Sequence, residues 1–412
     1  MAGETATHTV ALAHLLIDGR SHGIQWFVVQ LRDRSTGRLM PGVVAGNIGA
    51  KAGRGGLDNG WIQFNHVRIP RKHMLQRWAS VARDGTFTPA PNPSIAYAAL
   101  IPERLGVVLG TICNGGQALT IATRYSCVRR QGNNDELIMD YQTQQARLMP
   151  GIASIYVLNV LNRHIVAQWT QMTQIIDTKP DVFLAQLADV HAVSAGLKAA
   201  AGWWGSEVLE RCRRACGGHA FSAYNAIPGI IGDWGVMTTG GGDNIVLAQQ
   251  SARYLLGCVR RVMAGEQVAG SVDYLNDLPR LLSHARCATS SDAELISTET
   301  LRDLLGWLSA KQVIREMETA RQHTDLLPVL KRCGLLYALH CVQEQLGMLL
   351  EFGHLSSAQS ASIRRAFLDG CADLRKDAVP LVDAWGFPDF IIKAPIGRYD
   401  GNIYPGKQRH TS

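Results

Sequence analysis

The sequence lacks the features that mark several large classes of protein. Its 412 residues contain nine cysteines but no C-x-x-C pair, no period-three glycine, and no zinc-finger, RRM or KH signature. Irregularly placed cysteines favour reduced thiols over a disulfide framework. The missing signatures argue against a nucleic-acid-binding protein despite a net charge of +7. No stretch of 18 consecutive apolar residues is present, so we expect no membrane span.

The two ends of the given sequence also lack recognisable targeting signals. The first residues carry no basic segment, which argues against a secretory signal. The last three residues, His410-Thr411-Ser412, are not the S-K-L peroxisomal address. What the chain does have is an ordinary globular composition, 46% hydrophobic and 18% charged, with an excess of glycine at 41 residues. Its length predicts two to four domains.

Residues 1–95 have the pattern of β structure. Short runs rich in β-branched and aromatic residues occupy 7–17, 22–32 and 61–69, and Gly, Pro and Asp separate them. The connection 46–60 is rich in glycine but lacks G-x-x-x-x-G-K-[ST]. We therefore expect an irregular connection between strands here and no phosphate-binding loop.

From residue 96 onward the apolar residues follow a helical period. We expect a first helical domain at 96–270, a linker at 271–298 and a second helical domain at 299–412. Glycines 106, 110, 115 and 116 should let neighbouring helices approach closely, and Pro150 should kink its helix. Beyond the first helix, the expected helices are 140–172, 181–216, 244–263, 299–320, 327–350 and 358–381.

The common chemical motifs are weak. Cys212, Cys216 and His219 offer three potential ligands, but their spacing matches no common zinc site and a fourth ligand is missing. We therefore expect no metal. No G-x-S-x-G elbow surrounds any serine, and Cys127 and Cys216 are more typical of buried helical cysteines than of nucleophiles.

Six strings resemble the acyl-CoA oxidases of peroxisomal fatty-acid β-oxidation, and they occur in that family's order. They are Ala122-Thr-Arg-Tyr-Ser-Cys-Val-Arg-Arg-Gln131, Asp140-Tyr-Gln-Thr-Gln-Gln145, Ala195-Gly-Leu-Lys198, Ala215-Cys-Gly-Gly-His-Ala-Phe-Ser222, Ser271-Val-Asp-Tyr-Leu-Asn-Asp277 and Ile396-Gly-Arg-Tyr-Asp-Gly-Asn402. The resemblance covers nearly all of the chain up to about Tyr404.

This resemblance implies a fold and partners. The family has an N-terminal helical domain, a middle β domain and two C-terminal helical domains, and it is usually dimeric with FAD near the subunit interface. We expect this chain to begin inside the middle β domain, so that it is mainly α with an N-terminal β portion. The implied partners are acyl-CoA and either a second copy or a longer form of the chain. Peroxisomal location follows from resemblance, while the missing S-K-L leaves a cytoplasmic location open.

The family's reaction needs a base. A carboxylate takes a proton from the carbon α to the thioester, a hydride leaves the β carbon for the flavin, and dioxygen becomes hydrogen peroxide. In most members the base is the first Glu of an E-G-E-N string. Here that string is Gly241-Gly242-Asp243-Asn244, and glycine cannot accept a proton.

Glu103 is the candidate replacement base. Isovaleryl-CoA and long-chain acyl-CoA dehydrogenases present their base in an earlier helix, in a string that resembles Leu100-Ile-Pro-Glu103-Arg104. We therefore expect an acyl-CoA oxidase in which Glu103 acts for Gly241. The alternative is that Glu103 is a solvated residue favoured by the helix dipole, and that the chain is a non-catalytic binding or regulatory protein.

The resemblance implies further contacts, each with a local alternative. Arg104 matches an arginine that contacts CoA, or it forms a structural salt bridge. Arg129 and Gln131 match an R-x-Q string whose arginine reaches the FAD diphosphate across the dimer, or they form a solvated basic face. Gly132 stands where the dehydrogenases have an aromatic residue, which puts ring contacts there in doubt.

Two further pairs match cofactor positions. Gly217 and Gly218 match a turn that lets backbone approach FAD, although a simple helix stop has the same appearance. Asp243 and Asn244 match positions near the adenine, with helix capping as the alternative.

Overall fold

The computed structural model describes residues 3–92, 95–278, 287, 289, 291–297 and 326–403. The chain divides into two compact units, Met1–Ile101 and Pro102–Ser412. The division falls a few residues after the boundary that we expected at 95. One reason is that the short helix α1 (Ile95–Ala98) belongs to the first unit, where the indole nitrogen of Trp26 donates to the carbonyl of Ala96 at 2.9 Å.

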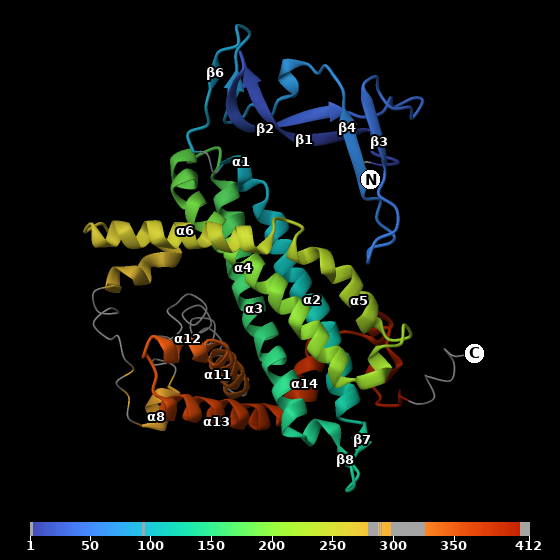
Figure 1. Cartoon of the computed structure of the whole chain (residues 1–412), viewed down its shortest axis with the longest axis vertical. Helices are drawn as coiled ribbons and strands as arrows, with labels where there is room; N and C mark the ends of the chain where they lie inside the picture. Colours follow the sequence, from blue (N-terminus) through green and yellow to red (C-terminus); the bar gives the residue numbers. More distant parts are fainter. Residues whose placement is uncertain are drawn as a thin grey trace. The chain divides into compact units, whose positions relative to one another are not determined.

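The first unit contains antiparallel hairpins, as its sequence pattern predicts (Figure 1). Asp18 and Gly19 make the turn between the first two strands with positive φ angles of 50° and 78°. The glycine-rich connection joins the two strands of the second hairpin and leads into no helix, as expected of an irregular connection. The pairs are β1 (His8–Ile17) with β2 (Arg20–Gln30), β3 (Val43–Asn47) with β4 (Gly60–Phe64), and β5 (Ser80–Val81) with β6 (Phe87–Thr88).

Long helices build the second unit. The first of them is α2 (Ile101–Ser126), and α3 (Gln142–Gln174), α4 (Pro180–Ala215) and α6 (Asn244–Met263) lie within two residues of their expected ranges. The expectation missed α5 (Ala226–Trp234), because Pro228, Gly229 and Gly232 give this short helix the composition of a turn.

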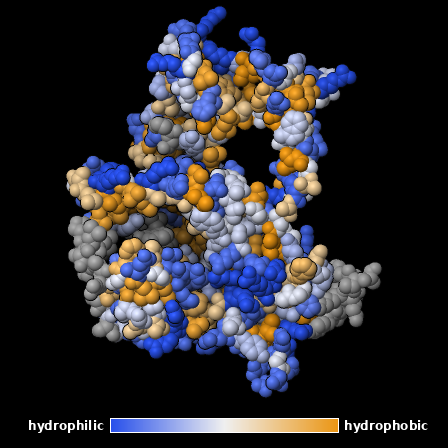
Figure 2. Space-filling view, viewed as in Figure 1, coloured by the Kyte–Doolittle hydropathy of each residue, from blue (hydrophilic) through white to orange (hydrophobic). Residues whose placement is uncertain are grey.

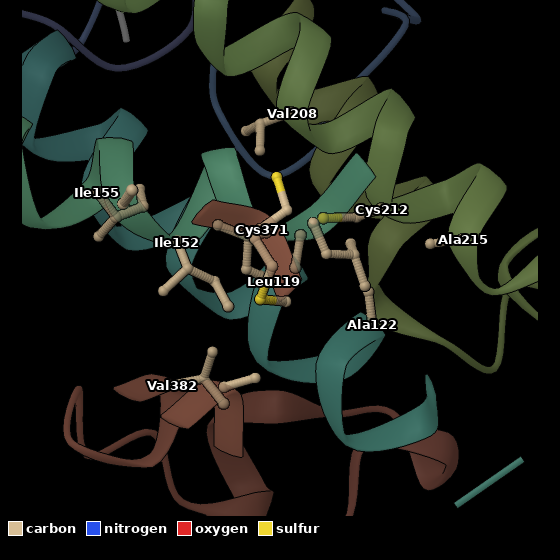
Figure 3. Close-up of a cluster of buried hydrophobic side chains, with 14 of the residues drawn as sticks. Leu119, Ala122, Ile152, Ile155, Val208, Cys212, Ala215, Cys371 and Val382 are labelled. Atoms are coloured by element: carbon tan, nitrogen blue, oxygen red, sulfur yellow. The ribbon is translucent and has the colours of Figure 1, made fainter. Parts of the chain in front are cut away.

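Apolar side chains from the long helices and from the C-terminal helices meet in the core of this unit. Figure 3 shows side chains of α2, α3 and α4 converging with two from the C-terminal part of the chain. Gly115 and Gly116 permit close packing as predicted, since β-carbons there would lie 3.2 Å from Ile155 and 3.1 Å from Phe387. The prediction is wrong for Gly106, where a β-carbon would meet open space. The labelled residues are Leu119, Ala122, Ile152, Ile155, Val208, Cys212, Ala215, Cys371 and Val382.

Within the described residues, one helical stretch is long and apolar enough to cross a membrane. It runs over Ile95–Ser126 with a mean hydropathy of 1.5 in an 18-residue window. In the structure, α2 packs its apolar side chains, Leu119 and Ile121 among them, into the core. The buried share of this window is 39%, so burial accounts for part of the apolar character of the helix.

The C-terminal helices share this core. The helices α11 (Leu327–Glu344) and α13 (Ser357–Leu374) pack against α3, and the shorter α8 (Asp292–Leu295), α12 (Leu346–Glu351), α14 (Ala378–Asp383) and α15 (Asp389–Ile392) complete the described part. The two helical portions that we expected as domains thus belong to one compact unit. The expected helix 299–320 lies outside the described residues.

The start of the expected linker 271–298 is packed. A 3-10 helix, Gly270–Asp277, buries Val272 and Leu275, and the backbone N–H of Ser271 donates to the carboxylate of Asp189 at 3.0 Å. The two buried residues are three positions apart, as a 3-10 helix requires. In eight mostly polar residues, one such spacing is too little to predict a helix from the sequence.

Arg124 joins α2 to the C-terminal segment. It is 6% exposed, its Nε donates to Asp383 at 2.9 Å, and its Nη1 donates to the carbonyl of Gly397 at 2.8 Å. The ring of Tyr399 lies 5.2 Å from the guanidinium carbon. One buried cation thereby fixes three separate places in the last third of the chain.

We expect Arg124→Met to lower the free energy of unfolding by about 3–5 kcal/mol, because it leaves Asp383 without its buried partner. Arg365→Met is the matched control. Arg365 and Asp292 lie 3.7 Å apart with both side chains 70% exposed, so this change should cost less than about 1 kcal/mol. Urea unfolding measures both values, and equal losses would contradict the role given to Arg124.

Candidate active site

Glu103 and Gly241 lie side by side. Glu103 is exposed in the first turn of α2, and Gly241 lies in the loop between the 3-10 helix Gly235–Thr238 and α6. A β-carbon built at Gly241 would lie 3.6 Å from Cγ, Cδ and Oε1 of Glu103. A side chain at position 241 would therefore begin in contact with the carboxylate of Glu103.

The loop itself offers hydrogen-bond donors. Gly241 and Gly242 have positive φ angles of 72° and 106°, which glycine adopts without strain. The N–H of Gly240 donates to Val236 at 2.6 Å, but those of Gly241 and Gly242 donate to no group in the described part of the chain. Backbone N–H groups without an internal acceptor are available to an anion or a polarised carbonyl oxygen.

Arg104 is a buried cation beside this loop. It is 2% exposed, and its Nε and Nη1 have no hydrogen-bond partner among the described residues. Burial lowers the pKa of Arg104, and the nearby Glu103 carboxylate opposes that effect. Burial, with a smaller effect of Arg104, also lowers the pKa of His191 to about 4. The salt bridge that we considered for Arg104 does not occur in the described structure, and two donors remain for a ligand.

Lys198 forms hydrogen bonds to the loop that contains Gly241. It is fully buried in α4, and its Nζ donates to the carbonyl of Gly242 at 2.6 Å and to Oδ1 of Asn244 at 2.8 Å. Burial lowers the pKa of its ammonium group. Sequence reasoning gave Lys198 no role. Its position between Ala195, Ala199 and Gly202 on one helix face was the available signal, because a lysine there must be buried.

Asp243 and Asn244 are engaged within the chain. Asp243 caps α6 by accepting from the N–H groups of Ile245 at 2.9 Å and Val246 at 3.3 Å, which is the alternative that we gave for it. Asn244 is 1% exposed, accepts from Lys198, and has no partner for Nδ2 among the described residues.

The other expected cofactor residues lie at the far end of α2. Arg129 is half-buried, and Gln131 is exposed in the small hairpin of β7 (Arg130–Gln131) and β8 (Glu136–Leu137). Gly217 and Gly218 follow the end of α4, where a β-carbon at either position would meet nothing within 4 Å. The rings of Tyr125 and His219, 5.6 Å apart, show that this turn lies beside the end of α2.

The candidate residues therefore form two groups. We call Glu103, Arg104, Gly241, Asp243 and Asn244 the base group, and Arg129, Gln131, Gly217 and Gly218 the distal group. With a rise of about 1.5 Å per residue, Glu103 and Arg129 are separated by roughly 40 Å along the helix. One cofactor molecule cannot contact both groups of the same chain.

Two local features concern the expected ring and metal contacts. Gly132 has a φ of 83°, and a β-carbon there would overlap the hydroxyl of Tyr141, so the aromatic residue of the dehydrogenases has no room in this conformation. Cys212 and Cys216 are buried in the core. Within the described residues, no group of three or more His, Cys, Asp or Glu side chains could hold a metal ion.

Comparison with known proteins identifies the family of the chain. Residues 97–256 match the family described as acyl-CoA oxidase, C-alpha1 domain, and residues 307–409 match the family described as acyl-CoA oxidase. Peroxisomal acyl-coenzyme A oxidase 1 of Mus musculus is 31% identical over 98% of this chain and 68% of its own length. The chain belongs to the acyl-CoA oxidase family.

Other members agree with this assignment. Acyl-coenzyme A oxidase 3 of Yarrowia lipolytica is 34% identical, and the chain spans 65% of its length, slightly under two thirds. The solved structure of Arabidopsis thaliana acyl-CoA oxidase 1 has a TM-score of 0.88 at 27% identity and covers all of this chain, which covers 69% of it. The predicted fold, mainly helical with an N-terminal β portion, is confirmed.

The cap on α6 can be tested directly. Asp243→Ala should lower the free energy of unfolding by about 1 kcal/mol, since two N–H groups at the start of α6 lose their acceptor. Asp243→Asn keeps an acceptor and should retain nearly all of the stability. Chemical denaturation measures both, and an alanine variant as stable as the parent would contradict the capping role. FAD titration of the asparagine variant separately tests the expected cofactor contact.

Proposed function

We propose that this chain is an FAD-dependent acyl-CoA oxidase of fatty-acid β-oxidation in which Glu103 is the catalytic base. The observation that carries the proposal is the 3.6 Å separation between the Glu103 side chain and a β-carbon at Gly241. Most members of the family begin their catalytic carboxylate at that position. Here the carboxylate comes from the first turn of α2 and lies beside that position.

The reaction divides among groups of the chain. Glu103 removes the proton α to the thioester carbonyl, and the β hydrogen leaves with its two electrons, so that a trans-2-enoyl-CoA forms. FAD, when bound, supplies the acceptor for that hydride and passes the electrons to dioxygen, which gives hydrogen peroxide. The N–H groups of Gly241 and Gly242, which have no acceptor among the described residues, are suited to hold the carbonyl oxygen as negative charge develops on it.

Arg104 suits the CoA part of the substrate. Two of its nitrogens are buried without a partner, and an unpartnered buried guanidinium is costly. A phosphate or ribose oxygen would satisfy these donors. The base group thus supplies a carboxylate for proton removal, backbone N–H donors for the thioester carbonyl, and a cation for the CoA moiety.

The distal group fits a flavin diphosphate. Arg129 and Gln131 provide side-chain donors, and the backbone at Gly217 and Gly218 is open to a ligand. Because the base group lies roughly 40 Å away along α2, these residues would serve the FAD of a second copy or a longer form of the chain. Exposed apolar side chains lie along α6, among them Ile245, Leu256 and Met263. Figure 2 shows hydrophobic surface at the C-terminal end of this helix, and such surface is available to a partner.

Relatives support the same assignment. The solved acyl-CoA oxidase-2 of Caenorhabditis elegans, with a TM-score of 0.85 at 27% identity, is described as bound with FAD, ascaroside-CoA and ATP. It covers 100% of this chain, which covers 67% of it. The Mus musculus relative is named peroxisomal, which favours a peroxisomal location for this chain over a cytoplasmic one.

A non-catalytic binding or regulatory role is the second candidate, and the missing carboxylate at Gly241 favours it. Purified protein separates the two. Flavin absorption and acyl-CoA-dependent peroxide support the oxidase, whereas colourless protein that does not take up added FAD supports the binding role.

Glu103→Gln should lower the turnover of FAD-loaded protein by at least about 100-fold, because the amide cannot accept the α proton. Glu351→Gln is the matched control, an exposed glutamate at the end of α12, and it should leave turnover unchanged. Both are assayed by enoyl-CoA and peroxide formation. Unchanged turnover of the Glu103 variant would remove Glu103 as the base.

Returning the carboxylate to position 241 should restore part of the lost activity. We expect Glu103→Gln with Gly241→Glu to recover measurable turnover, reduced because a non-glycine residue at a φ of 72° costs about 1–2 kcal/mol. The control is Glu103→Gln with Gly242→Glu, since a β-carbon at Gly242 has Leu247 as its nearest neighbour at 3.1 Å, whereas one at Gly241 has Glu103. Equal turnover of the two double variants would show that the position of the carboxylate does not matter.

A further inference from the structure

We propose that Lys198 is a positioning residue that fixes the Gly240–Asn244 loop against Glu103. The proposal deepens the proposed function and rests on it for its kinetic consequence. Lys198 lies on α4, whereas Glu103 lies on α2 and Gly241 on the loop before α6. The ammonium group of Lys198 would act on the reaction only through the loop.

The loop needs an anchor because its own sequence supplies little rigidity. Three consecutive glycines, 240 to 242, have the widest conformational freedom of any residues. The N–H of Gly240 is bonded to Val236, and Asp243 is held as the cap of α6. Between these two points, Gly241 and Gly242 donate no hydrogen bond within the described residues. The bond from Lys198 to the carbonyl of Gly242 is the tether for this stretch.

Lys198 holds the loop at two places that flank Asp243. One bond goes to the main-chain carbonyl of Gly242 and the other to the side chain of Asn244. Together they fix the peptide between Gly242 and Asp243, and so restrict the conformations open to the two preceding glycines, of which Gly241 lies beside the Glu103 side chain. A displacement of about 1 Å in a group that positions the substrate is enough to lower catalysis by roughly 100-fold.

The burial of Lys198 is expensive if it serves only to stabilise the fold. Its side chain is fully buried, and no carboxylate of the described residues lies within ion-pair distance of its Nζ. A well-packed apolar side chain of similar volume often stabilises a protein as well as a buried charge does. This contrast makes Lys198→Met an informative variant, because methionine can fill the space but cannot hold the loop.

The test compares Lys198→Met with Lys179→Met, each as the full chain loaded with FAD. Lys179 is the exposed residue before α4 and makes no side-chain capping bond. We expect Lys198→Met to speed hydrogen exchange in residues 240–247 by at least about 10-fold. We also expect kcat to fall about 10- to 100-fold with KM for acyl-CoA within about 3-fold of the parent. Lys179→Met should change neither quantity.

The outcomes separate this proposal from the proposed function. Unchanged exchange in residues 240–247 overturns the proposal, whatever the activity. Faster exchange with unchanged kcat also overturns it, because the loop would then move without consequence. If the parent chain has no oxidase activity, the proposed function fails, and the exchange experiment alone decides whether Lys198 holds the loop.

Lys198→Gln keeps the test decisive if the methionine variant does not fold. Its amide retains N–H donors without the charge, so one bond to the loop can remain. We expect exchange and kcat between those of the parent and of Lys198→Met. Exchange and kcat equal to those of the parent would overturn the requirement for both bonds.

Discussion

The approach of Glu103 to Gly241 is the constraint on which the rest of the site depends. It requires α2 to begin beside the loop before α6, and it requires that loop to turn through positive φ angles at two successive residues. Glycine at 241 meets both needs, since it accepts the conformation and leaves the space beside the carboxylate free. The loss of a side chain at one position and the gain of a carboxylate at another are therefore two parts of one arrangement.

Two buried cations, Arg104 and Lys198, determine the electrostatics of this site. Arg104 and Lys198 are almost completely buried, and Glu103 and Asp243 are the acidic groups that favour the charge of Lys198. Lys198 finds acceptors in the loop, whereas two nitrogens of Arg104 find none in the described chain. Lys198 thus stabilises the loop, and Arg104 keeps two hydrogen-bond donors that a ligand can use.

Sequence patterns predicted the long helices well because their apolar periodicity is decided locally. The ranges of α3, α4 and α6 followed from it, while the packed turn at Gly270–Asp277 and the short helix α5 did not. The site was less accessible. Glu103 could be found from a resemblance of strings, but the contact of Lys198 with Gly242 joins residues 44 positions apart and depends on how α4 rotates about its axis. Local propensity carries no information about such a contact.

The length of α2 separates the proposed base, Glu103, from the expected flavin diphosphate contacts. Its first turn carries Glu103 and its end leads to Arg129, so the distance between the two groups is fixed by helical rise at roughly 40 Å. Side-chain rearrangement cannot close a gap of that size within one chain. If both groups contact FAD, each FAD must lie between the base group of one polypeptide and the distal group of another. Oligomerisation would then be a condition for assembling the site, and the rigidity of α2, anchored at its end by Arg124, would set its dimensions.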